Sequence, residues 1–183
     1  MAAPTRTTAK RAPGMPETDF FEMTWEFFGE LCRVLAVKVA RSGYRPDLVV
    51  GIAKAGVIPG AVVASILQCD FYSLKISRDT GVERVRARPK IFSAAPREAA
   101  KKNVLIVDEI CTSGETLRIA TNALRQVGPA EIHTATSLVK HGGHRPDFYA
   151  LETENTVIFP WDRQVVTADG EVVVNPLYRG LIT

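Results

Sequence analysis

The sequence has few cysteines, no apolar run long enough to cross a bilayer and no Walker A phosphate loop. Its three cysteines, Cys32, Cys69 and Cys111, are widely spaced, without a CxxC pair or a neighbouring histidine cluster. That pattern excludes a disulfide framework and argues against a zinc site. Because the chain also lacks a signal-peptide core, we expect a cytoplasmic protein with reduced thiols and no membrane partner.

Charge of one sign is also scarce, since 23 Lys and Arg residues face 20 Asp and Glu residues, a formal net charge of +3. This balance is too small to predict nucleic-acid binding, and we expect no nucleic acid as a partner. The 46% hydrophobic content over 183 residues is typical of one globular domain. Residues 1–18 lack apolar periodicity and are predicted to be a flexible tail, which leaves 19–183 as the domain.

Apolar residues recur at spacings of three and four from Phe20 to Ser42, which predicts an amphipathic helix ending near Gly43. Short apolar runs and helical patterns then alternate. The predicted strands cover 47–52, 71–76, 104–107 and 132–139, and the predicted helices cover 59–67 and 115–127. This alternation predicts an α/β fold with a parallel twisted sheet flanked by helices. Segments 148–151 and 156–159 either extend the sheet or build a small subdomain with 172–181.

Residues Ser77–Lys102 are rich in Arg, Lys, Pro and Ala and have no sustained apolar period. The composition predicts a long loop or an irregular hairpin. Long loops inside compact domains are uncommon and often functional. The segment is therefore interpreted either as a mobile lid over a site or as a solvated basic excursion.

An apolar strand leads directly into Asp108 and Glu109, then into a hydroxyl-rich loop, and only then into a helix. Ligands of open α/β sheets bind beyond the carboxyl ends of strands, and backbone NH groups at a helix start favour phosphate. Gly114 would shape the loop, and its hydroxyl donors would be Thr112, Ser113 and Thr116. Carboxylates repel a bare phosphate, so the two acids suit sugar hydroxyls or the magnesium that accompanies a diphosphate.

Each of these residues also has an ordinary structural interpretation. Thr112 or Ser113 would cap the helix, and Asp108 and Glu109 would form a solvated strand end. The residue chemistry alone leaves both interpretations open.

The segment Val104–Thr116 (VLIVDEICTSGET) resembles the PRPP-binding signature of type I phosphoribosyltransferases. The resemblance implies the fold of that family, with a small C-terminal hood to which residues 141–183 contribute. It implies that Asp108 and Glu109 contact the ribose hydroxyls, hold Mg²⁺ and act in catalysis. It also implies that the 5′-phosphate is wrapped by the loop residues Thr112, Ser113, Gly114, Glu115 and Thr116.

The segment Gly51–Leu67 (GIAKAGVIPGAVVASIL) is similar to the diphosphate loop and following helix of the bacterial xanthine-guanine members of the family. Lys54, Ala55 and Gly56 occupy the loop. The resemblance implies PRPP binding by these three residues, a non-proline cis peptide beside Lys54, and a catalytic role for Lys54 in stabilising the departing diphosphate.

Two further segments resemble the base site of the 6-oxopurine enzymes. Ala135–Gly143 (ATSLVKHGG) is similar to the segment that sets a lysine against the purine O6, and Lys140 takes that position. Val157–Asp162 (VIFPWD) is similar to the hood segment that covers the base. The resemblance implies that Val157 and Asp162 contact the base and that Asp162 is a further magnesium ligand.

Thr112 departs from this pattern, because 6-oxopurine enzymes usually carry an acid there, near the purine N7. A threonine is a predicted base contact but cannot act as a carboxylate base. Asn155 and Thr156 stand where a stacking aromatic is often found in the hood. The sequence leaves the identity of the base open.

We therefore expect transfer of the 5-phosphoribosyl group from Mg-PRPP to a purine-like nucleobase, giving a nucleoside 5′-monophosphate and diphosphate. The basic segment would close over the site, with the lid arginines Arg78, Arg84, Arg86 and Arg88. The resemblance implies a homodimer or homotetramer. One alternative is a PRPP-sensing regulatory protein without transferase activity. Another is a general nucleotide-binding or phosphohydrolase domain, which would not explain the segments around Lys54 and Lys140.

Overall fold

The computed structural model describes residues 20–79 and 85–182. It comprises two compact units, which are described separately below. The larger unit runs from Gly29 to Thr153, and the smaller unit joins the described residues up to Phe28 with those from Glu154 onward. The tail predicted for residues 1–18 lies outside the described residues. The expected domain limits remain a prediction.

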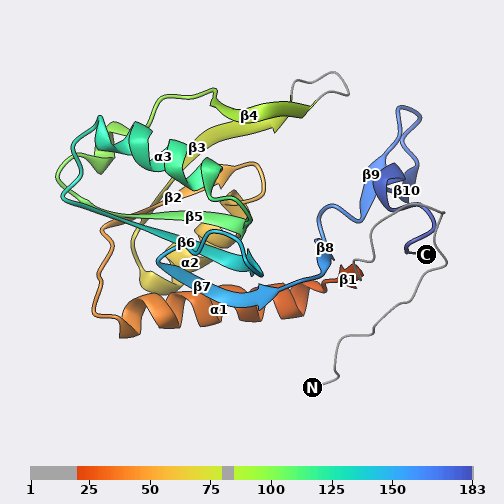
Figure 1. The fold of residues 1–183 in the computed structure, drawn as a ribbon, viewed down its shortest axis with the longest axis horizontal. Helices are drawn as coiled ribbons and strands as arrows, with labels where there is room; N and C mark the ends of the chain where they lie inside the picture. The colour runs from red at the N-terminus through yellow and green to blue at the C-terminus, as the bar shows by residue number, and fades with distance from the viewer. Residues whose placement is uncertain (1–19, 80–84, 183) are drawn as a thin grey trace. The chain divides into compact units, whose positions relative to one another are not determined.

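The larger unit is built on a six-stranded sheet with the order β4-β3-β2-β5-β6-β7 (Figure 1). The strands are β2 (Leu48–Ala53), β3 (Asp70–Asp79), β4 (Val85–Ile91), β5 (Asn103–Cys111), β6 (Glu131–Lys140) and β7 (Phe148–Thr153). Neighbouring strands run parallel except β3 and β4, which are antiparallel. The predicted parallel α/β sheet is confirmed.

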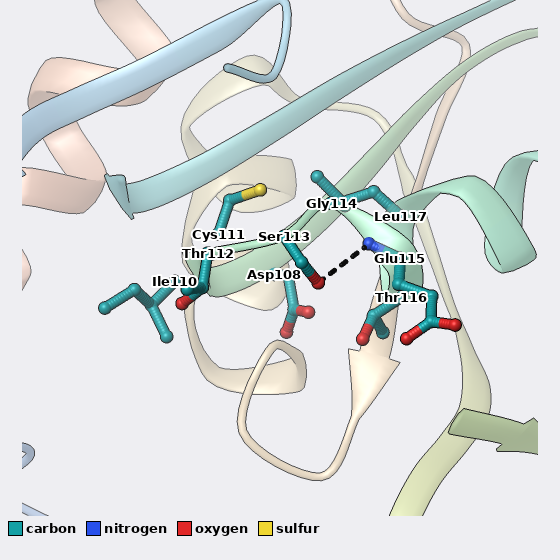
Figure 2. A pocket seen from close by; sticks show the side chains of 9 residues that line it. All are labelled: Asp108, Ile110, Cys111, Thr112, Ser113, Gly114, Glu115, Thr116 and Leu117. Atoms are coloured by element: carbon teal, nitrogen blue, oxygen red, sulfur yellow. Dashed lines mark hydrogen bonds between the residues drawn. The ribbon is translucent and has the colours of Figure 1, made fainter. Parts of the chain in front are cut away.

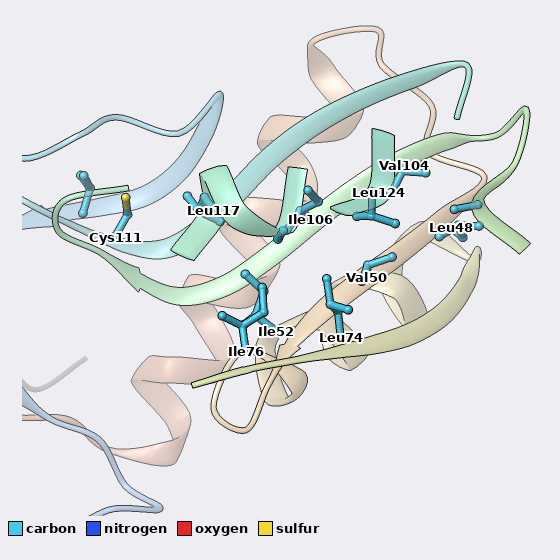
Figure 3. Close-up of a cluster of buried hydrophobic side chains, with 13 residues drawn as sticks. Leu48, Val50, Ile52, Leu74, Ile76, Val104, Ile106, Cys111, Leu117 and Leu124 are labelled. Carbon is cyan, nitrogen blue, oxygen red and sulfur yellow. The ribbon is translucent and has the colours of Figure 1, made fainter. Parts of the chain in front are cut away.

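Helices cover both faces of this sheet: α1 (Trp25–Arg41) and α2 (Val57–Leu67) lie on one face, and α3 (Glu115–Arg125) lies on the other (Figure 1). The first face buries Leu35 of α1 and Val63 of α2 against Val49 and Leu105. On the second face, Leu117 and Leu124 of α3 pack with the strand residues Leu48, Val50, Val104 and Ile106 (Figure 3). Burying each such side chain stabilises the fold by roughly 1.5–3 kcal/mol. The central strands thus bury apolar side chains on both faces, and the loops at their ends are attached to this packed core.

The first helix starts later than the apolar periodicity predicts. Phe20–Glu22 forms strand β1, which pairs in parallel with β8 (Thr156–Ile158), and α1 begins only at Trp25. Thr24 explains the boundary, because its hydroxyl accepts a hydrogen bond from the backbone NH of Phe27 at 3.2 Å, as helix-capping residues do. The helix ends at Arg41, and Gly43 follows with a φ of 89°, in the left-handed region expected after a helix.

The basic segment Ser77–Lys102 was predicted to be a long loop or an irregular hairpin, and it contributes to a hairpin. Strand β3 extends beyond Ile76 and pairs with β4, with a register shift between Ser77 and Asp79. A short 3-10 turn, η1 (Arg97–Ala99), follows. Residues 80–84 and the side chains of residues 78–87 lie outside the described part, so the lid roles of Arg78, Arg84 and Arg86 stay predictions.

The smaller unit contains the β1–β8 pair and a β-hairpin of β9 (Gln164–Val166) and β10 (Val172–Val174), followed by the 3-10 turn η2 (Pro176–Tyr178). Aromatic rings form its core. Phe159 stacks on Trp161 with ring centroids 4.7 Å apart, and Phe28 meets Trp161 edge-on at 4.8 Å. Segment 148–151 thus extends the main sheet, whereas 156–159 builds a small separate unit.

Two statements about the chemistry of the chain follow directly from the described residues. Cys32, Cys69 and Cys111 are not joined by disulfides, and Cys32 and Cys111 are buried. Within residues 20–79 and 85–182, no helix has the length and apolarity needed to cross a membrane.

Candidate functional site

The site lies at the carboxyl ends of β2 and β5, which are adjacent and parallel in the sheet. Gly51 pairs with Val107, so the end of β2 at Ala53 and the residues that follow Val107 lie side by side. Strand β5 was predicted to end at Val107 but continues to Cys111, because its partner β6 extends with it and pairs Cys111 with Val139. Asp108 and Glu109 therefore stand on a strand rather than on a free strand end.

Asp108 is the buried carboxylate of the site. Only 8% of the residue is exposed, and its Oδ1 accepts a hydrogen bond from the backbone NH of Glu109 at 3.1 Å. Burial, and secondly the neighbouring charge of Glu109, raise the pKa of Asp108 well above its usual range. A cation or hydroxyl donors placed here would relieve the cost of the buried charge.

The hydroxyl-rich loop and the start of α3 enclose a cavity of about 440 Å³ (Figure 2). The helix starts at Glu115 and its N-cap residue is Gly114, which has no side chain to cap the helix and has a φ of 72°. Capping therefore does not explain Thr112, and Ser113 makes only a 3.4 Å contact with the NH of Glu115. The cavity is lined by Asp108, Ile110, Cys111, Thr112, Ser113, Gly114, Glu115, Thr116 and Leu117. Backbone NH groups at a helix start and hydroxyls in a hollow of this kind can hold a phosphate.

A second cavity of about 240 Å³ adjoins the first and shares Asp108 and Thr116 with it. The loop after β2 supplies Lys54 and Ala55, and the peptide bond between Ala53 and Lys54 is cis, as the family resemblance implies. The complete lining is Ile52, Ala53, Lys54, Ala55, Ile76, Ser77, Pro89, Asp108, Glu109 and Thr116. Gly56, the last residue of this loop before α2, does not line the cavity.

Two lining residues come from the β3–β4 hairpin and were missed at the sequence level. Ser77 and Pro89 line the second cavity, whereas only arginines of this segment were predicted from the sequence to be lid residues. Nearby, Nε of Arg88 lies 4.0 Å from a carboxylate oxygen of Glu115, the first residue of α3. The arms of the hairpin thus reach both the second cavity and the start of α3.

Lys140 ends strand β6, and its partial burial lowers the pKa of the ammonium group. Val157 and Asp162, the other predicted base contacts, belong to the smaller unit. Val157 is 8% exposed, within the core of that unit. Both carboxylate oxygens of Asp162 are already bound: Oδ2 accepts from the Tyr178 hydroxyl at 2.5 Å, and Oδ1 accepts from the Asn175 amide at 3.2 Å. The proposed ligand roles of Val157 and Asp162 remain predictions.

Asp108 and Glu109 are carboxylates of the kind that could hold a magnesium ion together with a phosphorylated substrate. Among the described residues, no three His, Cys, Asp or Glu side chains form a group able to hold a metal by themselves. Mg²⁺ commonly takes one or two protein carboxylates and completes its octahedron with substrate phosphates and water. Burial and the charge of Glu109 raise the pKa of Asp108, and a bound cation would lower it again by favouring the ionised carboxylate.

A search for relatives matches residues 24–169 to the Phosphoribosyl transferase domain. The chain belongs to the phosphoribosyltransferase family. The xanthine-guanine phosphoribosyltransferase of Gluconobacter oxydans is 26% identical over 151 residues, covering 80% of this chain and 88% of that protein. The transcriptional regulator GfcR of Methanococcoides burtonii is 27% identical over 146 residues, covering 73% and 70%. The crystal structure of a purine phosphoribosyltransferase from Pyrococcus horikoshii matches with a TM-score of 0.69 and 25% identity, covering 81% of this chain and 97% of that one.

Membership in the family places the two cavities in a phosphoribosyltransferase enzyme with the expected parallel sheet. The match spans the loop after β2, the loop after β5 and the part of the smaller unit up to residue 169. The resemblance found in the four sequence segments is therefore confirmed at the level of the family.

Proposed function

We propose that this phosphoribosyltransferase moves the 5-phosphoribosyl group from Mg-PRPP to a purine-like base, producing a nucleoside 5′-monophosphate and diphosphate. The observation that carries the proposal is the pair of adjoining cavities that share Asp108 and Thr116. PRPP has a phosphate at one end and a diphosphate at the other. The cavity at the start of α3 suits the 5′-phosphate, and the cavity beside Lys54 suits the diphosphate.

The protein's part in the reaction is to position charges around the ribose. Asp108 and Glu109 accept hydrogen bonds from the ribose hydroxyls between the two phosphate sites. As the bond between the anomeric carbon and the diphosphate breaks, negative charge grows on the diphosphate beside Lys54 and the backbone of the cis-peptide loop. Groups fixed in advance favour this charge distribution over that of the ground state. Asp108 and Glu109 would hold Mg²⁺, which would further neutralise the diphosphate.

Lys140 and Thr112 carry the proposal for the base. A lysine ammonium donates hydrogen bonds and accepts none, so Lys140 favours a base with an exocyclic oxygen over one with an amino group. Thr112 offers a neutral hydroxyl in the loop of residues Thr112–Thr116, called the phosphate loop below. A relative named for xanthine and guanine supports this class of base.

The direct test incubates the purified protein with PRPP, magnesium and a panel of bases and measures nucleotide and diphosphate. Asp108→Asn and Glu109→Gln should each lower kcat/KM for PRPP by about 10²-fold, the scale on which single preorganised polar groups act. Asp169→Asn, on the exposed turn of the β9–β10 hairpin, is the matched control and should keep full activity. Wild-type activity in the Asp108/Glu109 double variant would remove both acids from the mechanism.

A PRPP-sensing regulator is the second candidate, and it is favoured by the similarity to a transcriptional regulator over 73% of this chain. The base panel separates the two functions. PRPP binding without turnover of any base, together with salt-dependent affinity for nucleic acid, would support the regulator.

Two further expectations belong to the same proposal. A cytoplasmic location is the natural setting for nucleotide metabolism, and localisation of a tagged chain in its host cell tests it. A homodimer or homotetramer is expected from the resemblance, and light scattering of the purified protein distinguishes these states from a monomer.

A further inference from the structure

The loop between β6 and β7, residues 141–147, touches the back of the phosphate loop. The backbone NH of His144 donates a hydrogen bond to the carbonyl oxygen of Thr112 at 2.8 Å. None of the residues 141–147 lines either cavity around Asp108. The contact therefore acts on the protein side of the phosphate loop, away from the ligand.

Gly143 allows the two backbones to approach this closely. A Cβ built at position 143 would lie 2.5 Å from the carbonyl oxygen of Thr112 and 3.0 Å from that of Lys140. The NH of Gly143 also donates to the Lys140 carbonyl at 2.9 Å. A tight turn thus connects Lys140, at the end of β6, to the backbone of the phosphate loop.

The imidazole ring of His144 packs on Gly114. A Cβ built at Gly114 would lie 2.4 Å from both Cγ and Cδ2 of His144, so the ring occupies the space that any other side chain at 114 would need. Gly114 also has a φ of 72°, which disfavours other residues. The ring therefore contacts the residue that immediately precedes α3.

The same loop is held on its other side by β7. His141 donates its backbone NH to Thr153 at 3.1 Å, and its ring lies 3.0 Å from Glu152. The Arg145 guanidinium pairs with the other oxygen of Glu152 at 2.7 Å and donates to the Tyr149 hydroxyl. The loop is thus attached to the sheet on one side and presses on the phosphate loop with the other.

We propose that Gly143 and His144 are positioning residues that hold the phosphate loop in its ligand-binding geometry and connect it to Lys140. This inference rests on the proposed function, because it assumes that the loop binds the 5′-phosphate of PRPP. Backbone donors that are already fixed cost less to order when the ligand arrives, so removing the support weakens binding. His144 acts through Gly114 and Thr112 and does not itself touch the phosphate.

Three variants separate packing from charge. His144→Ala removes the ring, His144→Phe keeps a planar ring without its nitrogens, and His141→Ala removes a ring of the same loop that faces β7. Titration calorimetry with Mg-PRPP, without a base, should show affinity about tenfold or more weaker in His144→Ala, since small displacements of binding groups are costly. His144→Phe and His141→Ala should stay within about threefold of wild type, a range that separates them from that loss. Steady-state kinetics should show the loss mainly in KM for PRPP, with kcat and Tm nearly unchanged.

A glycine pair gives a second, independent measurement. Gly143→Ala should weaken PRPP binding, because its Cβ collides with the Thr112 carbonyl. Gly142→Ala introduces strain at a φ of 69° in the same turn but meets nothing within 4 Å, so its PRPP affinity should be close to that of wild type. Equal affinities in Gly143→Ala, His144→Ala and wild type would overturn the inference. Because calorimetry uses no base, an absence of turnover would contradict the proposed transfer reaction while the affinity comparison still decides the role of the loop.

Discussion

Gly56 stands directly behind the carboxylate of Asp108. A Cβ built at Gly56 would lie 2.6 Å from Oδ1 of Asp108, and 2.8 Å from the carbonyl oxygens of both Ile52 and Val107. Two of these three atoms belong to backbone that cannot rotate away. The loop after β2 and the acid on β5 are therefore fitted to each other at a position where only glycine can stand.

Replacing Gly56 by alanine should consequently disturb both cavities through one methyl group. Overpacking of this kind typically costs about 1–3 kcal/mol of stability. We expect Gly56→Ala to lower Tm and to raise KM for PRPP by displacing Lys54 or Asp108. Thermal unfolding and steady-state kinetics measure the two effects.

Gly29→Ala is the matched control for this substitution. Gly29 lies in the interior of α1, and a Cβ there meets nothing within 4 Å. Alanine should stabilise this helix by up to about 1 kcal/mol relative to glycine and leave PRPP use unchanged. If Gly56→Ala left Tm and KM for PRPP as unaffected as Gly29→Ala should, the close fit between the loop and Asp108 would not matter for PRPP binding.

The raised pKa of Asp108 predicts how the stability of the ligand-free protein depends on pH. Burial and the charge of Glu109 make the folded protein hold this proton more tightly than the unfolded chain. The folded state then binds more protons above the ordinary aspartate pKa, so the free energy of unfolding should fall as pH rises through this interval. Asp108→Asn removes that slope and should raise Tm near pH 7 while it lowers activity. Thermal melts of both proteins over a pH series, without magnesium, check the prediction.

Adding Mg-PRPP provides the internal control for this pH effect. A cation and hydroxyl donors favour the ionised form of Asp108, so they should flatten the stability profile of the wild type. The explanation would be wrong if wild type and Asp108→Asn showed parallel profiles without ligand.

The arrangement of the sheet could be predicted because its strands are apolar on both faces. A short, continuously apolar run such as Val104–Val107, in a chain that alternates strands with helices, is typical of a parallel strand buried on both faces. The predicted boundaries of elements were wrong where a segment pairs with a strand that is distant in the sequence. Phe20–Glu22 continues the helical spacing of α1 but pairs with Thr156–Ile158, more than a hundred residues away. Likewise β5 extends past Val107 because β6 extends beside it.

The candidate site was predictable where one continuous segment carries it. Val104–Thr116 contains the strand, the acids and the phosphate loop in order, and the structure assembles them around one cavity. Ser77, Pro89 and His144 were not found, because their positions depend on how separate loops meet after folding. The sequence HGGH after Lys140 did contain a signal, since glycine allows close backbone approach.

Asp162 offers a separate prediction about the smaller unit. Its two oxygens accept hydrogen bonds from Tyr178 and Asn175, an arrangement that holds the η2 turn against the chain after Trp161. Asp162→Asn and Tyr178→Phe should both destabilise this unit, each by about 1 kcal/mol, because each weakens a partly buried, charge-assisted hydrogen bond. Differential scanning calorimetry measures the loss.

The pair of variants also tests the predicted magnesium role of Asp162. Tyr178→Phe leaves the carboxylate in place, so its activity should keep the magnesium dependence of the wild type. If Asp162→Asn alone raised the magnesium concentration needed for half-maximal activity, a metal role would be added to the structural one. Identical magnesium curves in both variants would restrict Asp162 to the structural role.

Lys140 provides the sharpest test of which bases are accepted. Lys140→Met keeps a long aliphatic stem but removes the ammonium donors, and charged hydrogen bonds are worth about 1.5–3 kcal/mol. We therefore expect kcat/KM for a 6-oxopurine to fall about 10- to 100-fold, the range equivalent to that energy, while PRPP affinity stays unchanged. Lys102→Met, at an exposed lysine before β5, is the control. Because burial lowers the pKa of Lys140, its charged form is lost as pH rises, so wild-type use of a 6-oxopurine should decline on the alkaline side. That decline should be absent from Lys140→Met, and its persistence there would assign the alkaline limb to another group.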